Sequence, residues 1–253
     1  MIDLTHGLNI EKSPLHYISF GYFVSRRFSL NLYERTAITP NEKEVVTSIP
    51  YMQGVVDMSN LIGNRVYENR EIRYTFYRFG VEKNTAQHFQ TTIENLLMGQ
   101  FDTRLDDTYE PDFHYIGKCK DVTVTDEYTR NRIKVEITFD LYPFKIDNRM
   151  ESADLFDPFN FDLDAFQNDL RFIVTNEKRN ILLYNTSQRT INPLVRADVA
   201  GAVLESDGIS HNLLEGTFTY PNLRLKPGIN EIVLSQDTDD TITVWFDWRK
   251  ERI

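Results

Sequence analysis

The sequence contains few of the residues that tie a protein to an oxidising or membrane environment. Its 253 residues include one cysteine, Cys119, and two tryptophans. A single thiol excludes a disulfide within the chain, which fits synthesis in a reducing cytoplasm. No run of about 18 apolar residues is present, so we expect no membrane span and no membrane partner. The first residues, MIDLTHGLNIEK, also lack the basic and apolar regions of a signal peptide.

Positive charge is scarce. The chain has 28 Lys and Arg residues against 38 Asp and Glu residues, for a formal net charge of -10. Nucleic acids and anionic lipids are bound through basic surfaces, because phosphate groups repel carboxylates. The charge balance therefore argues against both as directly bound ligands.

Catalytic and metal-binding motifs are missing as well. The histidines are scattered, without HxH or HExxH spacing, and no CxxC, GxSxG, P-loop or GxGxxG pattern occurs. Cys119 lies in an expected strand with no histidine nearby, so we interpret it as a packed thiol. We therefore predict no enzyme, no cofactor and no metal. Carboxylates are plentiful enough to leave a glycosidase pair open as a further interpretation.

Most segments that are present alternate between apolar and polar residues, as half-buried antiparallel strands do. Phe and Tyr, which favour strands, number 17 and 13. Only Asn84–Leu97 has the clear apolar spacing of a helix, and a second, short helix is expected over Asp162–Leu170. The alternating segments are Phe28–Leu32, Ile72–Phe76, Ile133–Leu141 and Ile242–Trp248, and a hairpin is expected around Lys226–Asn230.

These elements predict a mainly β protein of two domains. Pro143 ends the long strand at Leu141, and the stretch 145–158 reads as polar, acidic and irregular. We place the boundary near Asp147, which gives domains of 1–147 and 148–253. Two stretches, Glu34–Pro50 and Phe101–Phe113, read as long irregular loops, and long loops in compact domains are usually functional.

An acidic group and one tryptophan are candidates for assembly or binding. The densest acidic group does not have EF-hand spacing, so it predicts a solvated loop or assembly surface, with a cation site or catalysis as the alternative. Trp245 is out of phase with the apolar residues around it, so it could anchor a partner protein or a sugar, or cover a second layer. The acidic group is Asp102, Asp106, Asp107, Glu110 and Asp112.

Short motifs along the whole chain resemble, in order, those of distal tail proteins of phages with long non-contractile tails. The last two belong to the expected C-terminal domain. The motifs are Ile49–Gly54 with Asp57, Tyr67–Ile72, Leu105–Asp107 with Tyr115 and Gly117, Val135–Phe144, Leu225–Asn230 and Trp245–Arg249.

The resemblance implies a specific fold and role. It implies an N-terminal, sandwich-like β domain with one helix and a protruding hairpin, which closes into a six-fold ring. It also implies a C-terminal galectin-like β-sandwich outside that ring. Such a ring joins the tail tube protein to the tail-tip hub, passes DNA through its lumen, and carries baseplate or receptor-binding subunits on the outer domain. The protein would then be a virion component, assembled in the host cytoplasm.

Two further expectations follow from that role. The apolar residues of the first long loop would bury against a neighbouring subunit, and the acidic group would line the lumen or face outward. The alternative function is a carbohydrate-binding adhesion module on the host wall, but neither sugar-binding motif of galectins is present around His211 or Trp245. The candidate ring-interface residues are Ile38, Pro40, Val45, Val46 and Ile49.

Overall fold

The chain folds as two compact units of mostly antiparallel strands. The computed structural model describes residues 16–44, 46–47, 51, 53, 56–57, 65–80, 86–151, 170–237 and 241–253. The units are Met1–Lys145 together with Ile253, and Ile146–Arg252. Strands dominate both units, so the predicted mainly β fold class is confirmed.

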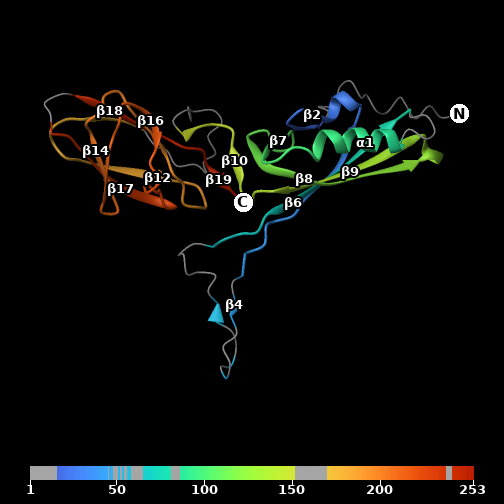
Figure 1. Ribbon diagram of the computed structural model, residues 1–253, viewed down its shortest axis with the longest axis horizontal. Coiled ribbons are helices and arrows are strands. Elements are labelled where there is room, and N and C mark those ends of the chain that lie inside the picture. Colours follow the sequence, from blue (N-terminus) through green and yellow to red (C-terminus); the bar gives the residue numbers. More distant parts are fainter. Residues whose placement is uncertain are drawn as a thin grey trace. The chain divides into compact units, whose positions relative to one another are not determined.

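The first unit is built on one bent antiparallel sheet in the order β2-β1-β7-β8-β9-β6-β3 (Figure 1). β9 (Arg132–Leu141) is the strand that alternation predicts, and its apolar side chains are buried. It pairs with β6 (Arg70–Phe79) on one side and β8 (Phe113–Glu127) on the other, and η3 (Tyr128–Arg130) joins β8 to β9. The other strands are β1 (Ile18–Phe20), β2 (Phe23–Val24), β3 (Asn31–Ala37) and β7 (Thr103–Asp107).

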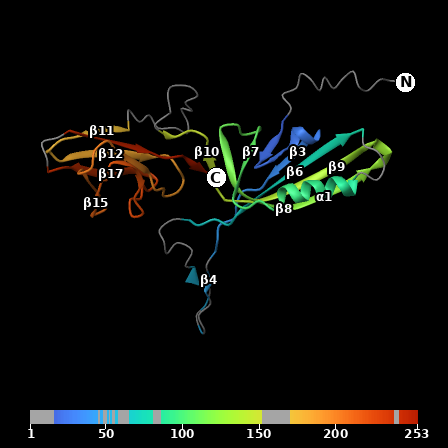
Figure 2. The same ribbon diagram turned by 45° about the horizontal axis from the view of Figure 1, so that its top comes forward.

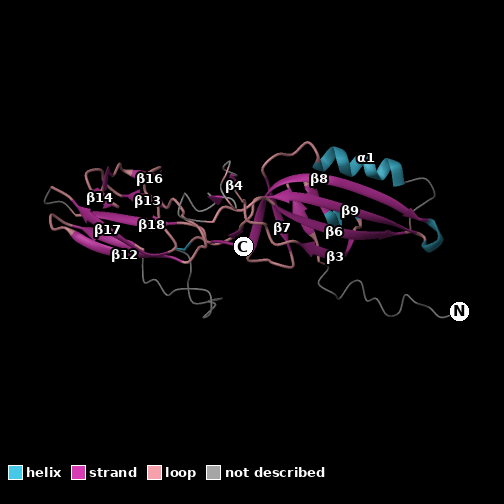
Figure 3. Cartoon of the chain, turned by 90° about the horizontal axis from the view of Figure 1, so that it is seen from below, coloured by secondary structure: helices cyan, strands magenta, loops and turns pink. Residues whose placement is uncertain are grey.

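The predicted helix is α1 (Ala86–Leu97), and it lies along one face of this sheet (Figure 3). Phe89, Ile93 and Leu97 are its buried residues, spaced four apart so that they form one apolar stripe. Residues 84–85, where the sequence predicts the helix to begin, lie outside the described part of the chain.

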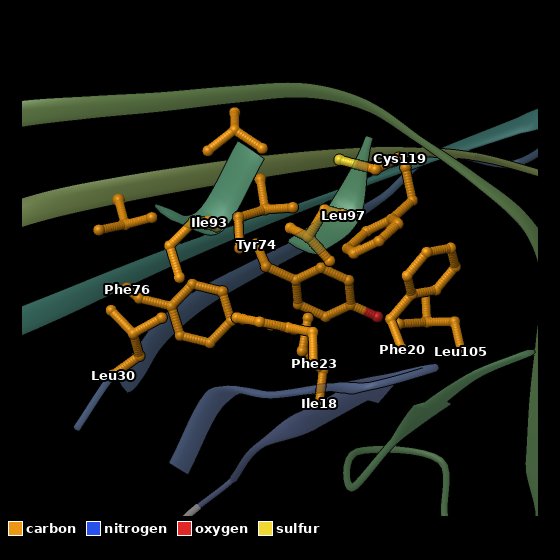
Figure 4. Close-up of a cluster of buried hydrophobic side chains, with 14 of the residues drawn as sticks. Ile18, Phe20, Phe23, Leu30, Tyr74, Phe76, Ile93, Leu97, Leu105 and Cys119 are labelled. Carbon is orange, nitrogen blue, oxygen red and sulfur yellow. The ribbon is translucent and has the colours of Figure 1, made fainter. Parts of the chain in front are cut away.

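The bend of the sheet brings strands together that are not neighbours in it. The rings of Phe20 on β1 and Phe139 on β9 have centroids 4.9 Å apart. Figure 4 shows Tyr74 and Phe76 of β6 between helix residues on one side and β1–β2 residues on the other. Each fully buried side chain of this size stabilises the fold by roughly 1.5–3 kcal/mol. The core therefore has a sandwich-like cross-section although a single sheet surrounds it.

Two sequence-based assignments in this unit are wrong. Phe28 ends a 3-10 turn, η2 (Ser25–Phe28), and Ser29 has a left-handed φ of 54°, so β3 begins only at Asn31. Residues 34–37, expected to open a long loop, belong to β3 and pair with β6. Most of their side chains are polar, so the alternation of apolar residues that indicates a strand is absent from this segment.

The expected loop Phe101–Phe113 is also mostly strand. β7 occupies Thr103–Asp107, and only five residues separate it from β8. Pairing continues to Gly117, which faces Leu141 across β8 and β9. A Cβ atom at Gly117 would lie 2.3 Å from the Asp140 carbonyl oxygen, so a glycine fits here and a larger residue does not.

Beyond β3 and β6 the chain continues as an antiparallel excursion (Figure 2). Glu42 and Tyr67 form an isolated bridge, and the Lys43 amide donates to the Val66 carbonyl at 2.7 Å. Farther out, β4 (Val46–Thr47) pairs with β5 (Val56–Asp57). This excursion, residues 38–69, is called the arm below.

The second unit is a β-sandwich. Its two four-stranded antiparallel sheets have the orders β11-β18-β13-β16 and β12-β17-β14-β15, and residues of both form one core. The strands are β11 (Arg171–Val174), β12 (Arg179–Asn185), β13 (Leu194–Ala197), β14 (Val203–Ser206), β15 (Ile209–Asn212), β16 (Gly216–Thr219), β17 (Gly228–Ser235) and β18 (Ile242–Asp247). Residues 162–169 of the second expected helix lie outside the described residues.

The hairpin expected around Lys226–Asn230 is wrong. Gly228 does have a positive φ of 93°, but β17 pairs with β12 and β14, which are distant in sequence. Leu225 instead forms an isolated bridge with Ile191. A turn signal is local, whereas the choice of partner strand depends on the whole sandwich.

The stretch after Lys145, expected to be irregular, begins as a strand. β10 (Lys145–Asp147) pairs with β19 (Glu251–Arg252). Lys250 and Glu151 form an ion pair at 3.3 Å whose side chains are 4% and 3% exposed. The end of the described chain thus holds the residues that open the second unit.

Candidate assembly surfaces

The five predicted acidic residues do not form one surface. Asp102 and Asp112 are exposed. Asp106 is half-buried and accepts a bidentate ion pair from Arg104, with N–O distances of 2.6 and 2.9 Å. The side chains of Asp107 and Glu110 turn inward instead, and that of Asp107 is 0% exposed. The assignment of Asp107 to an exposed lumen wall is therefore wrong.

Asp107 lies in a polar network that links distant strands. Arg35 of β3 donates from Nε to Asp107 Oδ2 at 2.5 Å, and its Nη2 donates to Glu110. The Tyr74 hydroxyl of β6 donates to the same Asp107 oxygen at 2.7 Å. Tyr115 of β8 donates to Glu110. The network holds together the bent ends of the sheet, because β3 and β7 are not neighbours in it.

Burial and charge set the protonation of this network. Burial alone would raise the pKa of Glu110, but hydrogen bonds from Lys145 and Tyr115 and the charge of Arg35 lower it to about 2. Burial and the hydrogen bond to Glu110 raise the pKa of Tyr115 to about 12. Burial and the Asp107 carboxylate also raise the pKa of Tyr74 well above its ordinary value. Glu110 is therefore ionised and both tyrosines are neutral, as a structural ion-pair network requires.

Sequence reasoning missed the partners of these acids. Arg35, Tyr74 and Lys145 are far from residues 102–112 in the sequence, and only the fold brings them there. One signal was present. Asp107 is in phase with the apolar Leu105 of β7, which marks an inward position.

Three of the five candidate ring-interface residues, Ile38, Pro40 and Val46, lie in the described part of the arm. Ile38 is 55% exposed, whereas Pro40 is buried within the unit. Val46 lies in β4, and nothing is described of its side chain. Val45 and Ile49 lie outside the described residues. The described arm base therefore has the apolar side chain of Ile38 exposed to solvent, two residues before the buried Pro40.

Trp245 lies on the outer face of the sheet that contains β18. It is half-buried, whereas Val244 and Phe246 on either side are buried in the core. The guanidinium groups of Arg171 and Arg196 lie over its ring, 5.6 and 5.0 Å from the centroid. The out-of-phase position read from the sequence thus corresponds to an outward-facing side chain.

The described residues contain little that resembles a catalytic or metal centre. No group of three or more His, Cys, Asp or Glu residues within them is placed to hold a metal ion. Burial raises the pKa of the Cys119 thiol to about 12, which makes it a poor nucleophile. In the same residues, no helix has the length and apolar character to cross a membrane.

The second unit contains a pocket of about 420 Å³ beside the end of β18. Asp247, Trp248 and Glu251 are among its lining residues. Burial raises the pKa of Glu251, but an ion pair with Arg189 at 3.3 Å opposes that effect. The Glu251 carboxylate in this pocket is therefore engaged by a guanidinium group.

Comparison with known proteins gives matches of structure but not of sequence. No family model and no curated protein matches the sequence. The fold is similar to that of SPP1 Dit (gp 19.1), described as a paradigm of the hub adsorption apparatus in phages that infect Gram-positive bacteria. The TM-score is 0.60 at 14% identity, and the match covers 92% of this chain and 98% of that one.

A second solved structure, the baseplate of phage p2 in its activated conformation with Sr, contains a chain with weaker similarity. The TM-score is 0.40 at 11% identity, with 93% and 97% of the two chains covered. That score is too low to imply a common fold. The SPP1 Dit likeness, by contrast, confirms the fold that the resemblance to distal tail proteins predicts.

Proposed function

We propose that this chain is a distal tail protein that forms a ring at the tip of a phage tail. The observation that supports this most strongly is the SPP1 Dit fold along 92% of the chain. The ordered motifs from Ile49 to Arg249 support it independently, because they were identified from the sequence alone. Proteins of this kind act by assembly, so we propose no enzymatic activity.

The two domains have separate roles in this proposal. Domain 1–147 forms a six-fold ring that joins the tail tube protein to the tail-tip hub, with DNA passing through its lumen. The arm reaches a neighbouring subunit, and the exposed Ile38 at its base is the described residue that best supports such a contact. Domain 148–253 is galectin-like and carries baseplate or receptor-binding subunits. The protein is located in the virion and is assembled in the host cytoplasm.

The lumen requires a wall that does not bind phosphate. Asp102 and Asp112 are the exposed acids of the predicted group and are the residues we assign to it. Asp107 and Glu110 stabilise the sheet, and Asp106 is neutralised by Arg104. A wall with few Lys and Arg side chains lets DNA pass, because binding to DNA depends on cationic groups that neutralise its phosphates and release their counterions.

Solution mass and negative-stain images of the purified full chain test this function. We expect a species of about six subunits and ring-shaped particles with a central opening. A monomer at micromolar concentration that binds glycans on an array would instead support the carbohydrate-binding module. A monomer without glycan binding would contradict both functions.

A further inference from the structure

The outer face of the β11-β18-β13-β16 sheet carries a tryptophan between two arginines. β18 lies between β11 and β13 in the sheet. The strand register places Arg171 and Arg196 directly opposite Trp245, one on each side. Their guanidinium carbons lie 5.6 and 5.0 Å from the indole centroid. These three residues are called the arginine–tryptophan row.

The two positive charges of the row lack a carboxylate partner in the part of the chain that the structure describes. Among the described residues, neither Arg171 nor Arg196 forms an ion pair. The acids closest in the register are Asp247, two residues along β18, and Asp198. The Asp198 carboxylate accepts a hydrogen bond of 2.7 Å from the Thr243 amide. In a chain of net charge -10, this face therefore presents two guanidinium groups that no described carboxylate neutralises.

The chemistry of the row selects a particular kind of ligand. A guanidinium group only donates hydrogen bonds, and it matches a carboxylate in bidentate geometry. Stacking on the indole restrains both arginines, so that less entropy is lost when a ligand binds. The indole adds apolar area between them, and Ile173 on the same face is 49% exposed. The matching ligand has two carboxylates with an apolar group between them.

We propose that the arginine–tryptophan row is a docking site for an acidic, extended segment of another tail protein. This inference rests on the proposed function, because it names the chemistry of a subunit that domain 148–253 would carry. A protein segment fits better than a sugar, since sugar hydroxyls need acceptors as well as donors, and the arginines supply donors alone. The segment contributes carboxylates to Arg171 and Arg196 and an apolar side chain to Trp245.

Strand geometry gives the spacing of the matching segment. Arg171 and Arg196 are separated by two strand spacings of about 4.8 Å each. In an extended peptide, side chains four residues apart lie on one face and about 13 Å apart. The long arginine and glutamate side chains can bridge the difference between these two separations. The probe is therefore a fluorescein-labelled peptide with the core Glu-Ser-Leu-Ser-Glu, and its matched control has glutamine for each glutamate.

Fluorescence anisotropy of the probe with the full chain tests the site. We expect the acidic peptide to bind and the glutamine peptide to bind at least about tenfold more weakly, because charge-assisted hydrogen bonds are lost. The double variant Arg171→Gln, Arg196→Gln and the single variant Trp245→Ala should each weaken binding by a similar factor. The matched control, Lys178→Gln with Arg224→Gln, removes the same charge from exposed positions outside the row and should bind as the unchanged protein does.

Equal binding by the double variant and its control would overturn the inference, as would equal binding of the two peptides or no binding of the acidic one. Binding of an anionic glycan at the row, without peptide binding, would also overturn it. Thermal unfolding of each variant distinguishes a structural role from a binding role. If the three residues were only structural, the unfolding midpoint of the variants would change and the Kd for the acidic peptide would not. If the acidic peptide does not bind but the protein forms rings, the docking site is refuted and the proposed function is not. If the peptide binds but no rings form, the proposed function alone is contradicted.

Discussion

The Tyr74 hydroxyl donates a hydrogen bond of 2.7 Å to the Asp107 carboxylate, although their strands are separated in the sheet by β8 and β9. Both side chains are buried. Arg35 reaches the same carboxylate from β3. This contact marks where the bent sheet closes on itself, so the shape of the first unit depends on a buried polar network as well as on its apolar core.

Removing the Tyr74 hydroxyl should destabilise the first unit. Tyr74→Phe leaves Asp107 buried with one fewer hydrogen bond, and bonds to charged groups contribute roughly 1.5–3 kcal/mol. We expect the free energy of unfolding, measured by urea denaturation, to fall by that amount. Tyr22→Phe is the control, because the Tyr22 side chain is 84% exposed. An equal effect of the two substitutions would contradict a structural role for the network.

The network also predicts how stability depends on pH. The pKa of Glu110 is about 2 in the folded chain against an ordinary 4.5. A lowered folded-state pKa stabilises the protein above the unfolded value, and that contribution is lost as pH falls from about 4.5 to 2. Across that pH range, the free energy of unfolding should fall less steeply for Glu110→Gln than for the unchanged protein. Asp102→Asn, at an exposed position, should keep the original slope.

The buried ion pair of the second unit should respond differently to single and double substitutions. Lys250→Met leaves Glu151 charged and buried, which costs about 3–5 kcal/mol. Replacing both residues, with Glu151→Leu added, should recover most of that stability because no charge remains buried. Lys226→Met is the matched control, since its pair with Asp207 has side chains 64% and 62% exposed. A double variant as unstable as the single one would refute this account.

Ile38 tests the contact between subunits in the proposed ring. Ile38→Lys places a charge on an exposed side chain, so the monomer should keep its unfolding midpoint while ring formation, followed by light scattering, weakens at least about tenfold. Ile209→Lys in the second unit is the control, because Ile209 is also exposed, at 43%. Normal rings from the Ile38 variant would remove the arm base from the interface.

The lumen assignment can be tested in assembled particles. Asp102→Lys with Asp112→Lys makes the proposed wall basic, so DNA should leave the particle more slowly, and added salt should restore the rate by screening. Particle yield and adsorption should stay unchanged, since both residues are exposed. Asp106→Lys is not a suitable test, because it also breaks the pair with Arg104. Unchanged ejection kinetics would show that these residues do not line the path.

Local patterns in the sequence were sufficient for the mainly β fold, β9 and α1. Alternation along β9 and four-residue spacing along α1 depend only on which side of one element is buried, and each can be read within a short window. The outward position of Trp245 follows for the same reason. The ordered motifs added a fold that composition alone does not imply.

Pairing across long sequence distances was decided only by the tertiary structure. An aspartate looks the same in a sequence whether it faces solvent, as Asp102 does, or is enclosed by Arg35 and Tyr74, as Asp107 is. The partner of β17 and the two arginines beside Trp245 likewise come from strands distant in sequence. A buried charge is stable only when it is paired with other groups, and here those groups come from strands distant in sequence. A local sequence pattern therefore cannot identify them.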